Sequence, residues 1–362
     1  MQKKIFTPGP TQVPPSVLSE TIQHTTYHRS DEFKSFYTQL LQKLKKIFST
    51  EQNVHVLTTS GTGAMEAAVV NFCEPNSNIL FLNQGRFGER WGSICRAHGI
   101  NSEELKVEYG TTVSIDDLRK TELAKYNAVF LTHSETSTAT LTDIKNLTAF
   151  IKNNSDALII VDAITAVAAI EFKMDEWKID VAVSASQKGL MSPPGLAFIA
   201  YGEDAKKRMF DNKQPRFFFD LRKEFKETEK GLTTWTPAVG LMYGVDEACN
   251  IILNKGLENT WKEVTQMAEH FRNETAKNCF RLYSSTPTDS LTALMLPDDM
   301  SSTSLINALK SKHGLQTANG QDELNGKIIR VSHMGDLNLD DIKKFTSIML
   351  EEFELLKNES KK

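Results

Sequence analysis

The chain has 362 residues, of which 40% are hydrophobic and 24% charged, and its formal net charge is −4. This is an ordinary globular composition, so we expect neither disorder nor low complexity. The acidic balance excludes the electrostatic signature of a protein that binds nucleic acid or an anionic membrane, and the length suffices for one large domain and a smaller second one.

The cysteines are scattered along the chain, with no Cys-x-x-Cys pair and no histidine cluster beside them: Cys73, Cys95, Cys249 and Cys279. We therefore expect no metal site, no disulfide framework and a reducing, cytoplasmic setting. The first ten residues lack the apolar segment of a signal peptide. The longest nearly apolar stretch, 157–170, is too short to span a bilayer.

Four prolines among the first fifteen residues predict an extended arm, followed by a short helix near 16–23. Apolar residues from Phe33 to Phe48 then recur at helical spacing, which predicts an amphipathic helix packed on the core. A strand at 54–58 and a helix at 65–73 flank the small-residue turn Ser60 to Ala64. Such a turn leaves backbone N–H groups free for a phosphate, although a purely structural connection explains it equally well.

Strand-like and helix-like stretches alternate from residue 78 onward, which is typical of a doubly wound α/β fold. We predict a mostly parallel sheet of the seven-stranded type, with strands at 78–82, 105–109 and 128–132 and helices at 86–98, 115–124 and 141–153. A later strand, 196–201, follows Pro193-Pro194-Gly195 so closely that it could pair in antiparallel fashion.

Two apolar runs in the middle of the chain end at chemically active residues. The first strand ends at Asp162, and a second, 180–185, delivers Lys188 just past its end. Because neighbouring strand ends converge on the crevice where ligands bind, the two side chains could face one small molecule. An amine that forms a Schiff base and a carboxylate that keeps a pyridine nitrogen protonated are what pyridoxal phosphate needs. Taken singly, each residue has a plainer explanation, a helix cap or a solvated lysine.

The C-terminal part predicts a different arrangement. Helices are expected from Pro237 to 253 and from 257 to 277, and no firm structure is expected for 216–229. Strands at 291–296 and 328–332 then alternate with helices at 302–312 and 339–357, which indicates a separate α+β unit. We place an N-terminal arm at 1–15, a large pyridoxal-phosphate-binding domain at 16–255 and a small C-terminal domain at 256–362.

Eight motifs occur in order along nearly the whole chain: TPGPTQVP, HRSDEF, TSGTGAMEA, HSETSTA, VDAITAVA, SASQKGL, TWTPAV and RVSHMG. This set resembles the class V aminotransferases of the fold-type-I pyridoxal phosphate enzymes. It is most similar to the serine- and alanine-glyoxylate aminotransferase group, with phosphoserine aminotransferase as a relative. It departs in having Phe87 where relatives often carry Trp, and Thr138-Ala139 where they commonly have Thr-Gly.

The resemblance implies a role for each of several residues. Lys188 would be the Schiff-base lysine and Asp162 the pyridinium partner, while Phe87 would stack on the ring, Ile164 pack on its other face and Thr136 contact its 3-hydroxyl side. The phosphate would be held by Thr62, Gly63, Ala64, Ser186 and Gln187, and by Thr236 of the other subunit. A homodimer with shared active sites is therefore implied.

Substrate recognition is expected from Arg330 and from the His28-Arg29 pair. An arginine in the apolar strand 328–332 is costly unless a carboxylate meets it, and the resemblance assigns that position to the substrate carboxylate. A structural salt bridge to Asp336 is the alternative. If the His28-Arg29 pair reaches the neighbouring subunit's pocket, a phosphorylated donor becomes plausible; if the pair is structural, a small neutral donor is favoured.

We therefore expect a pyridoxal-phosphate-dependent aminotransferase that moves an amino group from a serine- or alanine-type donor to a 2-oxo acid such as glyoxylate or pyruvate, with phosphoserine:2-oxoglutarate transamination as the alternative. A cysteine desulfurase needs a reactive cysteine, which the loop 317–321 lacks. A non-catalytic relative would be expected to lose Lys188 or Asp162. A hydrolase would need a Gly-x-Ser-x-Gly or His-Glu-x-x-His motif, and neither occurs.

Overall fold

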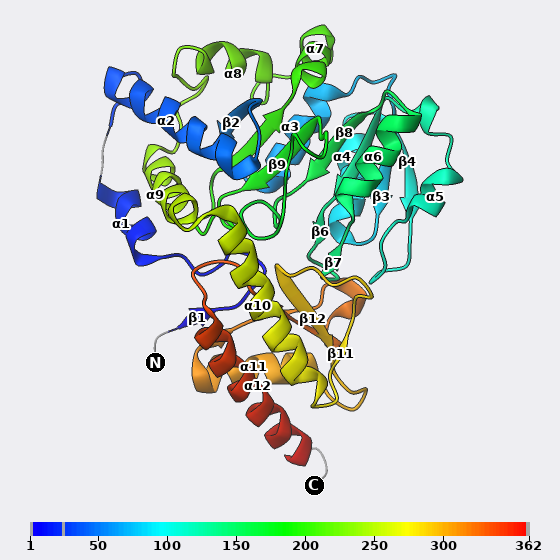
Figure 1. The fold of residues 1–362 in the computed structure, drawn as a ribbon, viewed down its shortest axis with the longest axis vertical. Helices are drawn as coiled ribbons and strands as arrows, with labels where there is room; N and C mark the ends of the chain where they lie inside the picture. The colour runs from blue at the N-terminus through cyan, green and yellow to red at the C-terminus, as the bar shows by residue number, and fades with distance from the viewer. Residues whose placement is uncertain (1–2, 24–25, 360–362) are drawn as a thin grey trace.

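The computed structural model describes residues 3–23 and 26–359, and its central element is a seven-stranded sheet (Figure 1). In spatial order the strands are β2 (Asn53–Leu57), β10 (Ala197–Tyr201), β9 (Val181–Ala185), β8 (Leu158–Asp162), β5 (Ala128–Thr132), β3 (Asn78–Asn83) and β4 (Asn101–Lys106). β10 pairs antiparallel with both of its neighbours, whereas the strands from β9 to β4 pair in parallel. The predicted mostly parallel sheet is confirmed.

Helices cover both faces of this sheet. Ile159 and Val161 of β8 belong to one buried cluster, which includes helix α2 (Asp31–Phe48) and helix α6 (Ile144–Asn154). Leu158 and Ile160 belong to the other cluster, with α3 (Gly61–Phe72), α4 (Arg86–Ala97) and α7 (Glu203–Asp211). Successive side chains of a strand point to opposite faces, so burial on both sides explains why this run is apolar throughout.

Four strands of the C-terminal part form a second, antiparallel sheet, in the lower half of Figure 1. Its strand order is β11 (Arg281–Leu282), β12 (Leu291–Met295), β15 (Ile328–Ser332) and β14 (Ala318–Asn319). Helix α9 (Val239–Lys255) leads into α10 (Leu257–Ala276), which packs with α12 (Leu339–Glu359), and α12 also contacts α11 (Ser302–His313). The division of the chain at residues 15 and 255 stays a prediction.

The N-terminal arm lies between the two sheets. Its strand β1 (Lys4–Ile5) pairs with β13 (Leu315–Gln316), and the N–H of Ser332 donates to the carbonyl of Phe6 at 2.8 Å. After helix α1 (Pro15–Gln23) the chain enters α2, whose start is fixed by Ser30: the Ser30 hydroxyl accepts a bond from the N–H of Phe33 at 3.1 Å. The arm is thus attached to the C-terminal elements rather than extended into solvent.

Several predicted boundaries are wrong. The strand expected at 105–109 is β4, Asn101–Lys106, a largely exposed strand at the edge of the sheet. Because most of its residues are polar, it has no apolar run by which it could be predicted. The helix expected at 115–124 is shorter, α5 (Ile115–Arg119), with a separate 3-10 turn at Leu123–Lys125. The helix expected from Leu141 starts at Ile144, because Thr140–Leu141 (β7) pairs with Ser134–Glu135 (β6). Helices α7 and α8 (Leu221–Thr228) were not predicted.

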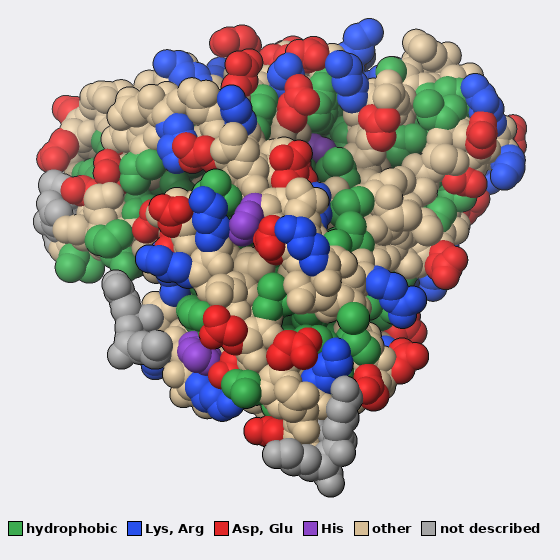
Figure 2. Space-filling view, turned by 60° about the horizontal axis from the view of Figure 1, so that its bottom comes forward, with side chains coloured by type: hydrophobic (Ala, Val, Ile, Leu, Met, Phe, Trp, Pro, Cys, Tyr) green, Lys and Arg blue, Asp and Glu red, His purple; other side chains and the backbone are tan. Residues whose placement is uncertain are grey.

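The surface carries acidic and basic side chains close together. On the face shown in Figure 2, red and blue groups alternate without a broad patch of one sign.

Within residues 3–23 and 26–359, no helix has the length and apolar character needed to cross a bilayer. Of the free cysteines, Cys279 is exposed and the others are buried.

Candidate active site

The ends of β8 and β9 and the starts of α3 and α4 surround a cavity of about 140 Å³. Its lining includes these predicted site residues: Thr62, Phe87, Thr136, Asp162, Ile164, Gln187 and Lys188. Residues separated by more than a hundred positions in sequence therefore meet at one edge of the sheet, as the crossover topology of an α/β fold requires.

Asp162 is the last residue of β8, and its side chain is 5% exposed. One carboxyl oxygen accepts a hydrogen bond from the N–H of Ile164 at 2.9 Å. Burial raises the pKa of Asp162 to about 7, which the Ile164 bond partly opposes. A carboxyl group whose pKa lies near neutrality is suited to share a proton with a basic ring nitrogen.

Lys188 follows β9 in a turn and lies beneath the N-terminal arm. Its Nζ donates to the carbonyl of Pro8 at 2.8 Å, while the hydroxyl of Thr11 donates to the Lys188 carbonyl at 3.0 Å. Burial lowers the pKa of Lys188 to about 8; the nearby charge of Asp162 opposes this shift, and those of Arg330 and Arg90 add to it. The amine is therefore neutral far more often than an exposed lysine, as a nucleophile or base must be.

One end of the cavity is formed by the first turn of α3. Ser60, Gly61 and Thr62 line it, and the Ser60 side chain does not cap the helix. Gly63 and Ala64, which were also predicted to hold a phosphate, do not line it. The Ala64 N–H is already bonded to the Ser60 carbonyl at 3.2 Å, so a free N–H group for an anion must come from earlier in the turn.

Ser186 and Gln187 differ in their access to the cavity. Ser186 is fully buried and donates its hydroxyl to the Pro193 carbonyl at 2.7 Å, so it fixes the lysine turn instead of lining the cavity. Gln187 does line the cavity, and its side-chain oxygen finds no hydrogen-bond partner within the described part of the chain.

Arg90 and Thr165 are cavity residues that were not predicted from the sequence. Arg90 lines the cavity, donates to the Thr62 hydroxyl at 3.0 Å, and places its guanidinium 4.6 Å from the centre of the Phe87 ring. Burial lowers the pKa of Arg90, and the charge of Asp162 opposes that shift. The spacing of three residues from Phe87 on a helix was the available signal.

Arg330 is joined to the cavity wall without lining the cavity. It is 7% exposed on β15, and its guanidinium donates to the carbonyls of Asn319 and Thr136, each at 2.8 Å. Within residues 3–23 and 26–359 the Arg330 guanidinium bonds these two carbonyls and forms no ion pair, so the alternative of a salt bridge to Asp336 is wrong. Burial lowers its pKa to about 10, an effect opposed by the charge of Glu135.

Thr236, His28 and Arg29 do not line the cavity of this subunit. Thr236 is exposed. Arg29 donates to the carbonyls of Thr233 and Thr234, at 3.0 and 3.4 Å, in the segment just before Thr236. Arg29 and Thr236, which were predicted to act at the neighbouring subunit's site, therefore lie close to one another and not at the cavity that contains Lys188.

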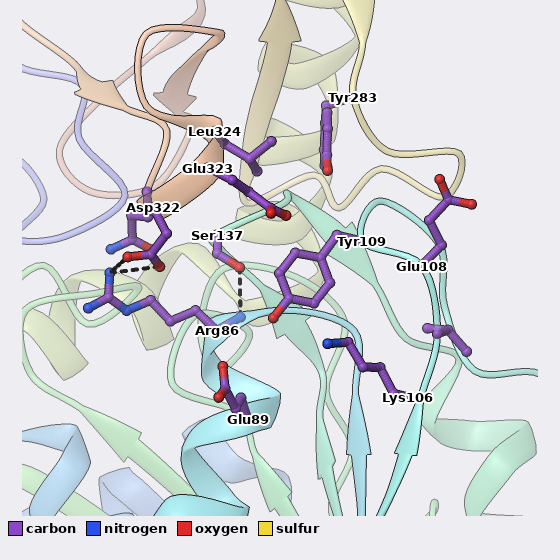
Figure 3. Close-up of a pocket in the computed structure, with 12 residues that line it drawn as sticks. Arg86, Glu89, Lys106, Glu108, Tyr109, Ser137, Tyr283, Asp322, Glu323 and Leu324 are labelled. Carbon is purple, nitrogen blue, oxygen red and sulfur yellow. Dashed lines mark hydrogen bonds and ion pairs between the residues drawn. The ribbon is translucent and has the colours of Figure 1, made fainter.

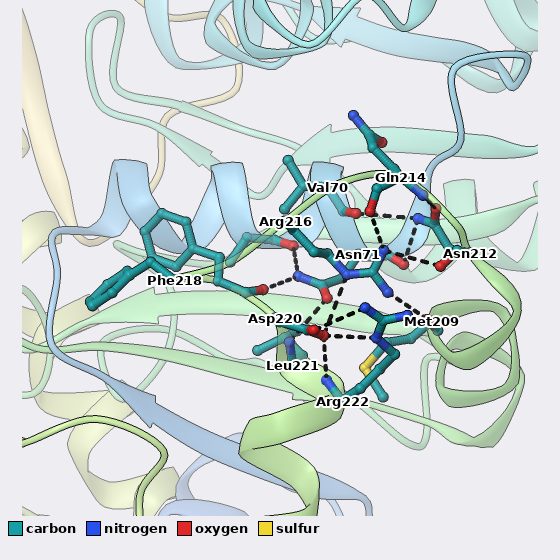
Figure 4. A network of polar contacts seen from close by, with 12 residues as sticks. Val70, Asn71, Met209, Asn212, Gln214, Arg216, Phe218, Asp220, Leu221 and Arg222 are labelled. Atoms are coloured by element: carbon teal, nitrogen blue, oxygen red, sulfur yellow. Dashed lines mark hydrogen bonds and ion pairs between the residues drawn. The ribbon is translucent and has the colours of Figure 1, made fainter.

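A polar network holds the start of the loop that leads to Thr236 (Figure 4). Arg216 donates to the Met209 carbonyl at 2.8 Å, and Arg222 forms two bonds to Asp220, at 2.8 and 2.9 Å. Asn71 of α3 donates to the Phe219 carbonyl at 2.5 Å. The loop is thereby fixed to the same helix whose first turn lines the cavity.

A second hollow, of about 460 Å³, lies beside this site (Figure 3). It is bounded by Tyr109 and Tyr283 and by an ion pair at 3.3 Å between Arg86 and Asp322. Both partners of that ion pair are well exposed, so it contributes little to stability. Ser137, next to Thr136 in the chain, links the hollow to the wall of the first cavity.

Comparison with known proteins identifies this arrangement. The model of the family Aminotransferase class-V matches residues 5–341. The chain belongs to the class-V aminotransferases. It is accordingly a transaminase, and its α/β fold is that of solved aminotransferase structures.

Three similar proteins cover nearly the whole chain. A Synechococcus sp. (strain PCC 6716) protein named soluble hydrogenase, small subunit, is 34% identical over 92% of this chain and 89% of its own length. A serine–glyoxylate aminotransferase of Methylorubrum extorquens is 30% identical over 92% and 87%. The solved structure of a Thermus thermophilus aspartate aminotransferase of subgroup IV superposes with a TM-score of 0.92 at 30% identity, covering 97% and 99%.

Proposed function

We propose that this class-V aminotransferase uses pyridoxal phosphate to transfer the amino group of a small, serine- or alanine-type amino acid to glyoxylate or pyruvate. The observation that carries the proposal is the meeting of Asp162 and Lys188 at one cavity, with pKa values shifted to about 7 and about 8. Perturbed acid and base groups in one cleft are typical of catalytic sites.

The residues fit the cofactor at each end of the cavity. The uncapped first turn of α3 offers N–H groups to a phosphate, and Phe87 and Ile164 offer apolar surface to a ring. When bound, pyridoxal phosphate supplies an electron sink for negative charge at the substrate α-carbon. Asp162 would keep the ring nitrogen protonated, and Lys188 would carry a proton from and to the α-carbon.

A small neutral donor agrees with the charges near the cavity. Arg90 and Lys188 are the basic residues of its lining, and Arg90 is bonded at the phosphate end through Thr62. Arg29 is occupied by backbone carbonyls and lies 3.9 Å from Glu227. A phosphoserine donor would need cations that this subunit does not direct at the cavity, and the relative named serine–glyoxylate aminotransferase supports the neutral donor.

A substrate panel tests the proposal. Serine, alanine, aspartate and phosphoserine are each paired with glyoxylate, pyruvate and 2-oxoglutarate, and hydrogen uptake with a viologen dye is measured in parallel because one relative is named a hydrogenase subunit. We expect the highest kcat/KM for serine or alanine with glyoxylate. A preference for phosphoserine with 2-oxoglutarate, or hydrogen uptake without transamination, would contradict it.

We further propose a cytoplasmic homodimer in which the partner completes each site. Tyr27, next to His28, and Phe217, whose ring lies 5.1 Å from that of Trp235 beside Thr236, are 68% and 71% accessible, which is unusual for large apolar side chains. A dimer contact there would bury both rings and bring Thr236 to the neighbouring phosphate. Sedimentation that shows a fully active monomer would contradict this arrangement.

The Gly9→Ala substitution should remove most cofactor binding. Gly9 has a φ of 147°, and a Cβ built on it would lie 2.2 Å from Nζ of Lys188, so the methyl group must displace either the arm or the lysine. We expect the visible absorbance gained on adding pyridoxal phosphate to fall by about tenfold or more. The matched control is Gly99→Ala, also at positive φ but with no atom within 4 Å of the new methyl; equal absorbance in the two variants would contradict the prediction.

The Arg330→Lys substitution should raise KM for both donor and acceptor, because both substrates carry the same carboxylate. A lysine cannot make the paired contacts of a guanidinium, and we expect an increase of about tenfold or more, with the spectrum of the bound cofactor unchanged. Arg272→Lys is the control, since Arg272 bonds Asp289 at 2.8 Å away from the cavity. An unchanged KM in Arg330→Lys would show that the carboxylate binds elsewhere.

A further inference from the structure

A buried carboxylate that the chemistry does not use lies behind the cavity wall. Glu135 is fully buried and does not line the cavity. Its two oxygens nevertheless bind two different segments. One accepts the N–H groups of Phe87 and Gly88 at 3.0 and 2.9 Å, and the other accepts the N–H and hydroxyl of Ser137 at 3.0 and 2.5 Å.

These bonds close a ring of contacts. The Ser137 hydroxyl, which donates to Glu135, accepts the N–H of Arg86 at 3.1 Å (Figure 3). Gly85 allows the approach, because a Cβ there would lie 2.4 Å from the Glu135 side chain. The start of α4 and the loop after β5 are therefore tied together by one side chain.

The tied segments carry residues of the site. Phe87 lies on the α4 side, and Thr136 lies between Glu135 and Ser137 on the loop side. The Thr136 carbonyl in turn accepts the guanidinium of Arg330 at 2.8 Å. A shift of the loop would therefore move Thr136 and the anchor of Arg330 together.

The surroundings favour the ionised form of Glu135. Four donors point at its oxygens, and a carboxylate can accept all of them whereas a carboxylic acid must keep one oxygen as a donor. Burial raises the pKa of Glu135, but the bonds from Ser137, Gly88 and Phe87 oppose that shift, and the positive end of α4 adds to their effect. Glu135 thus supplies a negative charge near Arg330 without occupying its guanidinium.

We propose that Glu135 is a positioning residue: its carboxylate ties the turn that carries Phe87 to the loop that carries Thr136, and so holds the contacts of the cofactor ring and the anchor of Arg330 in one arrangement. This inference rests on the proposed function, since it concerns the residues assigned to pyridoxal phosphate and to the substrate carboxylate. It assigns Glu135 no direct part in proton transfer.

Glu135→Gln tests the proposal, because the amide keeps the shape but presents an NH₂ group to N–H donors. We expect the Kd for pyridoxal phosphate, measured by fluorescence titration of the apoprotein, to rise about tenfold to a hundredfold. The visible circular dichroism of bound cofactor should shrink, and KM should rise for both substrates. Glu135→Asp keeps the charge but is too short to reach both segments, so it should not restore the Kd.

The control is Asp180→Asn at the opposite end of β9. Asp180 is a largely buried carboxylate, with a side chain 12% exposed, and it accepts the Ile159 N–H at 2.6 Å. Loss of the Asp180 carboxylate should lower the Tm of the protein without changing its Kd for pyridoxal phosphate. If Asp180→Asn shows the same rise in Kd at an equal loss of Tm, the effect of Glu135→Gln is general destabilisation and the proposal is overturned. A wild-type Kd and KM in Glu135→Gln would also overturn it.

If Glu135→Gln does not fold, the Ser137→Ala variant tests the proposal instead. It removes one donor and the Arg86 contact while leaving the carboxylate, so a Kd about threefold or more above wild type is expected and an unchanged Kd overturns the proposal. Wild-type protein is titrated alongside. If wild-type protein itself fails to bind pyridoxal phosphate, the proposed function fails; if it binds and the variants bind equally well, only the inference about Glu135 fails.

Discussion

Lys188→Ala should abolish transamination and remove the visible absorption band of the cofactor-loaded protein. Lys188 is the lysine of the cavity lining, and no other group there can both bond to the cofactor aldehyde and move the α-proton. We expect turnover to fall by about ten-thousandfold, the upper range for losing a positioned general base. The measurement is single-turnover kinetics with serine, followed by the visible spectrum.

Two controls accompany this variant. Lys120→Ala removes a lysine whose side chain is 78% exposed and should leave both band and rate unchanged. Added primary amines small enough to enter the cavity should restore part of the rate in Lys188→Ala, since the methyl group leaves space where the side chain stood. Turnover in Lys188→Ala within tenfold of wild type would show that another residue moves the proton.

Asp162→Asn should retain the cofactor and lose most of the rate. The amide can still accept from the Ile164 N–H, so the local turn persists, but it cannot hold a ring nitrogen in its protonated form. Removing one group that stabilises developing charge costs about a hundredfold to a thousandfold in kcat, and we expect a loss in that range with a Kd for pyridoxal phosphate within a few-fold of wild type.

The pH dependence of the absorption band distinguishes a specific effect of Asp162→Asn from misfolding. A folded variant should keep the secondary-structure circular dichroism of wild type while its band titrates at a shifted pH, because the nearby negative charge is gone. Wild-type kcat in the variant would show that Asp162 is not the partner of the ring nitrogen.

The sheet and the central pair of residues could be predicted from the sequence because their signals are local. The buried strand before Asp162 and the strand before Lys188 are continuous apolar runs, and the crossover rule for α/β folds then brings their ends together. The edge strand β4 could not be found in this way, since its residues are mostly exposed and only the neighbouring strand β3 defines it.

Other features of the site depend on contacts between distant segments. The Pro8 carbonyl meets Lys188 across 180 positions, and Arg330 meets the Thr136 carbonyl across 194. No pattern in a single sequence reports such backbone contacts. The motif marks the turn before α3 but not which N–H groups the helix itself uses, and the Ala64 N–H is one of these. Glu135 was overlooked among the hydroxyls of its segment.

Reduction with borohydride tests the central claim most directly. Wild-type protein is incubated with pyridoxal phosphate, reduced, digested and mapped by mass spectrometry, with untreated and unreduced samples as controls. We predict that the phosphopyridoxyl group is found on Lys188, in the segment Ser186-Gln187-Lys188-Gly189. A label on another lysine, or stoichiometric binding with no label on Lys188, would contradict the assignment of the active site.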